Sequence, residues 1–64
     1  MKPTKTESIK LLHAEADRYT NLAKNIALQL LRDPYAPDVE KKKRQAQDHL
    51  VRAETFNAAA ALIS

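Results

Sequence analysis

The chain has 64 residues, with 11 Lys and Arg against 8 Asp and Glu, a net charge of +3, and neither cysteine nor glycine. A chain of this length forms one small domain, without disulfides or cysteine-based metal sites to stabilise it. The lack of glycine excludes the glycine-dependent phosphate-binding loops, and the mild positive charge alone neither requires nor excludes a nucleic-acid partner.

The first predicted element is a helix over residues 5–32. Thr4 and Glu7 have the spacing of a capping box, with Thr6 as an alternative cap. Pro34 ends the helix because it disfavours the α conformation at Asp33. Apolar residues spaced alternately by three and four form one seam, as in a coiled coil. The seam consists of Ile9, Leu12, Ala16, Tyr19, Ala23, Ile26 and Leu30.

Residues 33–38 form a predicted short loop with two prolines, followed by a second helix over about residues 38–63. Asp38 is a cap, or an acid of the first turn together with Glu40. Alanines recur at seven-residue intervals in this helix and allow a neighbouring helix to approach closely. The predicted stripe is Ala46, His49, Leu50, Ala53, Phe56, Asn57, Ala60 and Ile63.

The fold class predicted from these elements is all-α, a single antiparallel helical hairpin over residues 1–64. A hairpin buries one face of each helix, yet further apolar residues flank both seams. These are Leu11, Leu22, Leu28, Leu31, Val51, Ala58, Ala59 and Leu62. We therefore expect a homodimer or higher oligomer, such as a four-helix bundle. The expected seam residues are Ile9, Leu12, Ala16, Ala23, Ile26, Leu30, Ala46, Leu50, Ala53, Phe56 and Ala60.

Five cations are predicted to converge near the loop, beside Tyr35. They are Arg32, Lys41, Lys42, Lys43 and Arg44. Such a cluster fits a phosphate, an RNA backbone or an acidic protein surface. It equally fits a solvated helix face that only keeps the protein soluble, with acidic residues nearby as neutralisers.

Tyr19 is predicted to lie opposite Arg52 in the hairpin. A seam tyrosine buries its ring and leaves its hydroxyl at a wet edge, and beside a cation it also suits stacking on a nucleobase. Asn57 is either a polar residue that sets the helix register or a ligand contact. His13 and His49 lie about nine residues apart along the axis, too far to share a metal ion within one hairpin.

Catalysis has little support in this sequence. The serines, Ser8 and Ser64, lie near the ends of the chain without a well-placed histidine, and the carboxylates are scattered over charged faces. We expect no enzyme activity, no cofactor and no metal.

The segment from Ala46 to Ala61, with Leu50, Ala53 and then Phe56-Asn57-Ala58-Ala59-Ala60, resembles the second helix of phage anti-CBASS cyclic-oligonucleotide sponges. Phe56 stands where that family tends to have tryptophan, and the basic residues 41–44 are also similar. The resemblance covers about twenty residues. It implies a homo-oligomer that sequesters cyclic oligonucleotide messengers between protomers and so blocks host immune signalling. Tyr19 or Tyr35 would then stack on the bases of the ligand, and Arg52 and the basic run would neutralise its phosphates.

Two other functions fit the same sequence. A protein-binding adaptor or inhibitor would dock a host protein on the apolar flanks. An RNA-binding four-helix bundle would resemble the plasmid Rop regulator in architecture, although the net charge of +3 counts against it. With no long apolar run and no apolar leader segment in residues 1–10, we expect no membrane partner and a cytoplasmic protein, in a bacterial host if phage-encoded.

Overall fold

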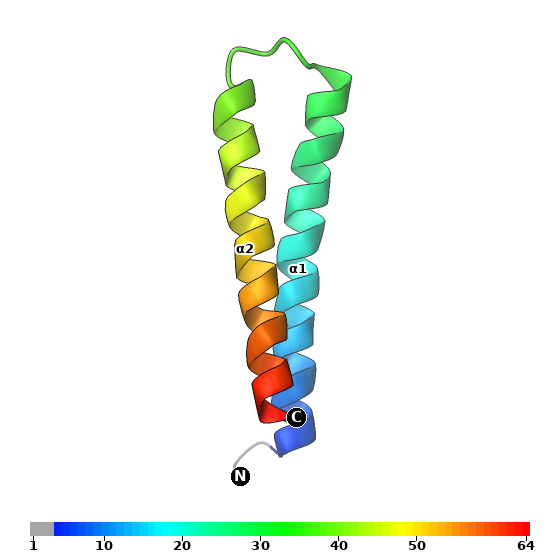
Figure 1. The fold of residues 1–64 in the computed structure, drawn as a ribbon. Coiled ribbons are helices and arrows are strands. Elements are labelled where there is room, and N and C mark those ends of the chain that lie inside the picture. Colours follow the sequence, from blue (N-terminus) through cyan, green and yellow to red (C-terminus); the bar gives the residue numbers. More distant parts are fainter. Residues whose placement is uncertain (1–3) are drawn as a thin grey trace.

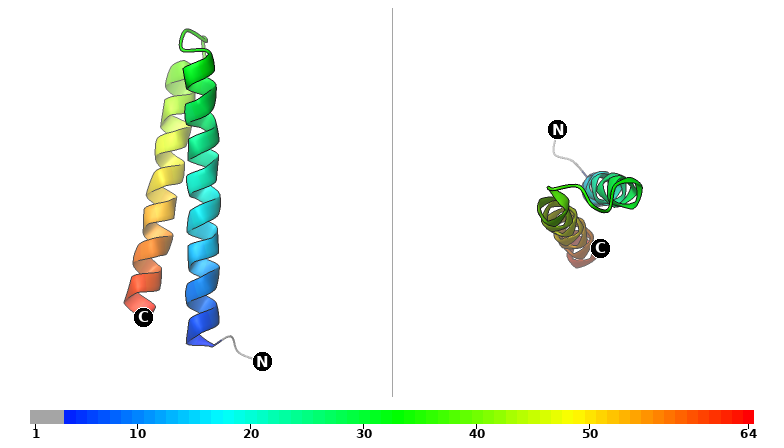
Figure 2. Two further views of the ribbon diagram at one scale, coloured as in Figure 1. Left: turned by 90° about the vertical axis from the view of Figure 1, so that its right-hand side faces the viewer. Right: turned by 90° about the horizontal axis from the view of Figure 1, so that it is seen from above.

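The computed structural model of the protein describes residues 4–64 and consists of two long helices packed as a hairpin (Figure 1). Helix α1 spans Lys5–Arg32 and helix α2 spans Val39–Ile63. The predicted all-α hairpin is confirmed for this part of the chain; residues 1–3 of the predicted domain lie outside the described residues. The hairpin measures 49 × 15 × 15 Å, and the start of α1 and the end of α2 share the distal end, opposite the loop end (Figure 2).

A capping box begins α1, as the sequence predicts. The Thr4 hydroxyl accepts a hydrogen bond from the Glu7 backbone at 3.2 Å, and the Glu7 carboxylate accepts one from the Thr4 backbone at 3.3 Å. The cap is therefore Thr4 and not Thr6. Helix α1 ends at Arg32, and Asp33 takes a non-helical ψ of 77° before Pro34.

The loop passes through two turns before α2 begins. The backbone amide of Ala36 donates to the carbonyl of Asp33, and that of Val39 donates to the carbonyl of Ala36. Asp38 occupies the N-cap position, but its side chain makes no capping hydrogen bond. Its carboxylate lies 3.5 Å from the ammonium of Lys42 instead, so the predicted cap acts as one partner of an ion pair.

Among residues 4–64, only alanines are fully buried between the helices. They are Ala16, Ala23, Ala53 and Ala60. Their small side chains lie along the seam between the helices, and larger half-buried side chains fill the spaces to either side. These are Ile9, Leu12, Tyr19, Ile26 and Leu30 from α1, and His49 and Phe56 from α2; Ala46 is half-buried as well. In residues 4–64, no large side chain is completely buried.

Three residues of the stripe predicted on α2 are exposed and lie at or beyond the edge of this interface. They are Leu50, Asn57 and Ile63. Leu50 and Asn57 directly follow His49 and Phe56, so the helix turns them about 100° from the centre of the seam, and Asn57 reaches α1 at its edge, through His13. Ile63 is the last residue of α2, where the neighbouring helix covers it only in part. The prediction that Leu50 belongs to the seam is wrong for the contact between α1 and α2.

Candidate functional site

Tyr19 of α1 inserts between two aromatic rings of α2. Its ring stacks on His49, with centroids 5.8 Å apart, and on Phe56, with centroids 5.7 Å apart and an interplanar angle of 9°. His49 and Phe56 are one heptad apart, and together with Arg52 and Ala53 they have the spacing of a four-residue hole that receives one side chain. Tyr19 is thus a knob that locks the register of the two helices.

Two guanidinium groups flank the same tyrosine. The Arg52 Cζ lies 5.7 Å from the Tyr19 ring centroid, which confirms that these residues face each other. The Arg18 Cζ lies 5.0 Å from it, and Arg18 Nη2 also contacts the tyrosine hydroxyl at 3.5 Å. One carboxylate, that of Glu15, pairs with Arg18 at 3.0 Å. This tyrosine–arginine cluster (Glu15, Arg18, Tyr19, Arg52) combines an aromatic ring with two cations and one anion.

Neither Arg18 nor the contacts of His49 and Phe56 with Tyr19 were predicted from the sequence. Arg18 directly precedes the seam tyrosine and follows Glu15 by three residues, a spacing that predicts an ion pair with Glu15. The aromatic stack requires knowledge of which residues of α2 face Tyr19. That depends on the register between the two helices, and no local pattern specifies it.

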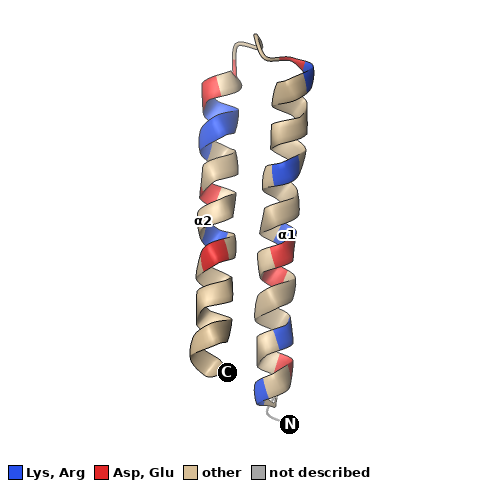
Figure 3. Cartoon of the chain, turned by 45° about the vertical axis from the view of Figure 1, so that its right-hand side comes forward, with Lys and Arg blue, Asp and Glu red and all other residues tan. Residues whose placement is uncertain are grey.

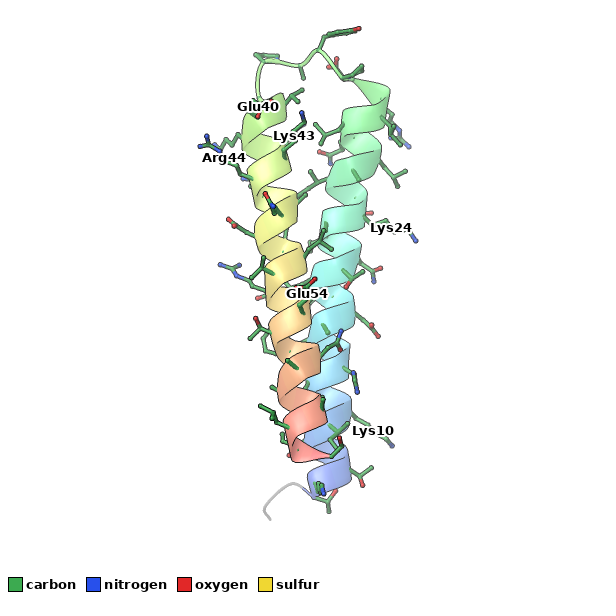
Figure 4. All side chains as sticks on the ribbon, viewed as in Figure 1. Lys10, Lys24, Glu40, Lys43, Arg44 and Glu54 are labelled. Atoms are coloured by element: carbon green, nitrogen blue, oxygen red, sulfur yellow. The ribbon has the colours of Figure 1, made fainter. Side chains whose placement is uncertain are left out.

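The cations predicted to gather near the loop are partly neutralised within their own helix. Lys42 pairs with Asp38, and Lys43 lies 3.5 Å from Glu40. Figure 3 shows the acidic start of α2 directly before the continuous basic segment of this end. In Figure 4, Arg44 projects away from α1, while Lys24 projects away from α2 on the other side.

Tyr35, which the sequence places beside these cations, is 94% exposed at the tip of the loop. Arg32, Lys41 and Arg44 are also exposed. Tyr19 and Arg52 belong to the middle of α1 and α2, whereas Arg32, Tyr35 and residues 41–44 belong to the loop end of the hairpin. The predicted ligand contacts therefore form two separate groups on one chain.

The two histidines have different surroundings. His13 Nδ1 lies 3.0 Å from the Asn57 side-chain oxygen across the helix interface, so Asn57 makes a polar contact at the exposed edge of the seam. His49 stacks on Tyr19, and its Nδ1 is buried without a hydrogen-bond partner in the described residues. Residues 4–64 contain no group of three or more His, Cys, Asp or Glu arranged to hold a metal ion.

Residues 4–64 form no pocket on the surface of the hairpin. Neither helix has both the length and the apolar character required to cross a membrane.

Comparisons with protein families, with curated proteins and with solved structures found no match to this chain.

Proposed function

We propose that the chain is a non-enzymatic binding protein whose hairpins assemble with one another into a helical bundle. One observation supports this most strongly: the fully buried core consists of four alanines, while nine large apolar side chains of the described residues are exposed. Alanines alone bury little apolar area, and a hairpin this small needs further burial to fold stably. Contact between copies supplies that burial.

The accessible surface of the chain leads to the same proposal. It is 5260 Å² for a protein of 7.2 kDa. A folded monomer of that mass exposes about 4,100 Å² on the empirical scaling of surface with mass. A standard protein interface removes about 800 Å² from each partner, so pairing with a second copy would remove most of the excess.

Sedimentation velocity over a dilution series, combined with native mass spectrometry, tests the assembly. We expect a defined oligomer that dissociates on dilution, with helix content falling as it dissociates. A folded monomer at all concentrations would overturn the proposal.

For the ligand, we propose a cyclic oligonucleotide held between copies in the cytoplasm of a bacterial host. The tyrosine–arginine cluster supports this through Arg52, an exposed cation beside Tyr19 whose guanidinium is suited to pair with a phosphate. The resemblance of residues 46–61 to cyclic-oligonucleotide sponges adds to it. Because a single hairpin has no pocket, such a ligand would have to be enclosed by more than one chain.

Calorimetry with cyclic dinucleotides and trinucleotides tests the ligand. We expect Arg52→Gln to weaken binding at least tenfold, while Arg44→Gln, an exposed arginine on the same helix but remote from Tyr19, leaves it within about twofold. Failure of the wild-type protein to bind any of these compounds would exclude this ligand class and leave the assembly proposal intact.

A protein-binding adaptor is the second candidate. Leu31 is 78% exposed and Leu28 is 48% exposed, both near the loop end of α1. Exposed leucines on one helix suit the groove or helix of another protein. If the hairpin proves to be a folded monomer, these residues become the first to change to glutamate in a search for a protein partner. Nucleic-acid binding is less favoured, because Lys42 and Lys43 are already paired with carboxylates.

A further inference from the structure

Residues 55–64, which are the last nine residues of α2 and Ser64, contain no charged side chain. Figure 3 shows this end of the helix without a basic or acidic residue. Leu62 is 89% exposed there, Ile63 and Ala58 are exposed, and Ala59 is half-buried. Leu11 of α1 is 63% exposed. We call these five residues the distal apolar patch.

The helix register places Leu11 at the same level as this segment. The contact between His13 and Asn57 sets residue 11 opposite residue 59 in the antiparallel pair. If the buried alanines are heptad position a, then His13 and Asn57 are both at e, whereas Leu11 and Leu62 are both at c and Ala59 is at g. Positions c and g lie on the side of each helix away from e, so the patch continues from one helix to the other.

The two ends of the hairpin differ in charge. Residues 32–44 at the loop end carry five Lys and Arg and three Asp and Glu, a net charge of +2. At the distal end, residues 5–16 carry two Lys and two Glu, and residues 55–64 carry none. Two copies side by side in the same direction would bring their positive loop ends together, and those ends would repel each other.

We propose that the distal apolar patch is the surface on which a second copy of this chain docks, in an antiparallel two-fold dimer whose loop ends point apart. This inference rests on the proposed self-assembly and specifies its face and direction. The patch of one copy fits the same patch of a second copy, because both are apolar and uncharged and a two-fold interface brings the same surface of each subunit together. It also accounts for the excess of accessible surface over that of a monomer of 7.2 kDa.

Two leucine variants locate the interface. Leu62→Glu changes the distal apolar patch, and Leu31→Glu is a matched control, because Leu31 is similarly exposed on the single hairpin but lies near the loop. Neither substitution affects the contact between α1 and α2, so both variants should keep their helix content in circular dichroism. We expect Leu62→Glu to weaken the dimer at least about 100-fold in sedimentation velocity, since the two-fold axis duplicates each lost contact. We expect Leu31→Glu to leave the dimer within about threefold.

The direction of the two copies is tested separately by a distance measurement. The chain contains no cysteine, so Tyr35→Cys introduces a single spin-labelling site at the loop tip. The antiparallel dimer predicts a separation of the two labels near or above the 49 Å length of one hairpin. A parallel arrangement predicts about 10–20 Å, from the usual spacing of packed helices.

The outcomes distinguish this inference from the assembly proposal. A wild-type protein that is monomeric overturns both. A dimer that resists Leu62→Glu, or that Leu31→Glu weakens equally, overturns the proposed face but not self-assembly. A short distance between the loop labels overturns the antiparallel direction alone. Loss of the dimer in Leu62→Glu only, together with the long distance, supports the inference.

Discussion

Replacement of Ala53 by leucine tests the close packing of the two helices most directly. Ala53 is 4% exposed and forms part of the hole that receives the Tyr19 ring. Leucine adds three carbon atoms at a point where the alanine methyl already fills the space. Either the helices separate or Tyr19 leaves its position between His49 and Phe56. Overpacking of this kind lowers the free energy of unfolding by about 1–3 kcal/mol.

That loss is a large share of the stability of so small a protein. A chain of 64 residues has a free energy of unfolding of about 3–10 kcal/mol. For a domain of this size, each kcal/mol lowers the melting temperature by about 4–8 °C. We therefore expect Ala53→Leu to lower it by about 4–24 °C in thermal unfolding followed by circular dichroism. All samples must have the same protein concentration, because self-association raises the melting temperature with concentration.

Ala14→Leu is the control for this experiment. Ala14 is exposed on α1, and leucine has nearly the same helix propensity as alanine. We expect Ala14→Leu to change the free energy of unfolding by less than about 0.5 kcal/mol. An Ala53→Leu protein as stable as the wild type and as Ala14→Leu would refute the close approach of the helices at this position.

Three further predictions concern named contacts. Tyr19→Ala should lower the free energy of unfolding by about 2–3 kcal/mol in urea titration, because it removes the aromatic ring that packs between the helices. Tyr19→Phe loses only the 3.5 Å contact of the hydroxyl and should be as stable as the wild type. Equal losses in the two variants would show that the hydroxyl and not the ring stabilises the hairpin. Thr4→Ala should cost about 1 kcal/mol by removing the cap, and Thr6→Ala, which leaves the cap intact, should cost less; the reverse order would place the cap at Thr6. A double-mutant cycle of His13→Ala and Asn57→Ala should give a coupling energy of about 0.5–1 kcal/mol, and additive effects would contradict the hydrogen bond.

Much of the fold follows from local patterns in the sequence. Thr4 and Glu7 specify where α1 begins, and Pro34 specifies where it ends, because capping and proline act on the neighbouring backbone. The unbroken seam from Ile9 to Leu30 correctly predicts the face of α1 that packs on α2. The start of α2 was harder to predict, since Asp38 meets the requirements of a cap but pairs with Lys42 instead.

The candidate site could be predicted only in part. The contact of Tyr19 with Arg52 follows from the loop length, which sets the approximate register of an antiparallel hairpin. The stacking on His49 and Phe56 does not follow from it, because a shift of one residue changes which side chains meet. The neutralisation of the loop-end cations agrees with one of the two interpretations of the sequence, because Lys42 follows Asp38 and Lys43 follows Glu40 at the i,i+4 and i,i+3 spacings of helical ion pairs.

Local patterns are enough to predict two helices joined by a short, proline-containing loop, because helix propensity, caps and proline act on backbone within a few residues. Which side chains lie at the centre of the seam and which lie at its edge depends on how the two helices pack. Leu50 shows the difference, since it is apolar and next to the seam residue His49 yet 47% exposed. A rotation of about 100° per residue separates a buried position from an exposed one, and the packing of the second helix selects between them.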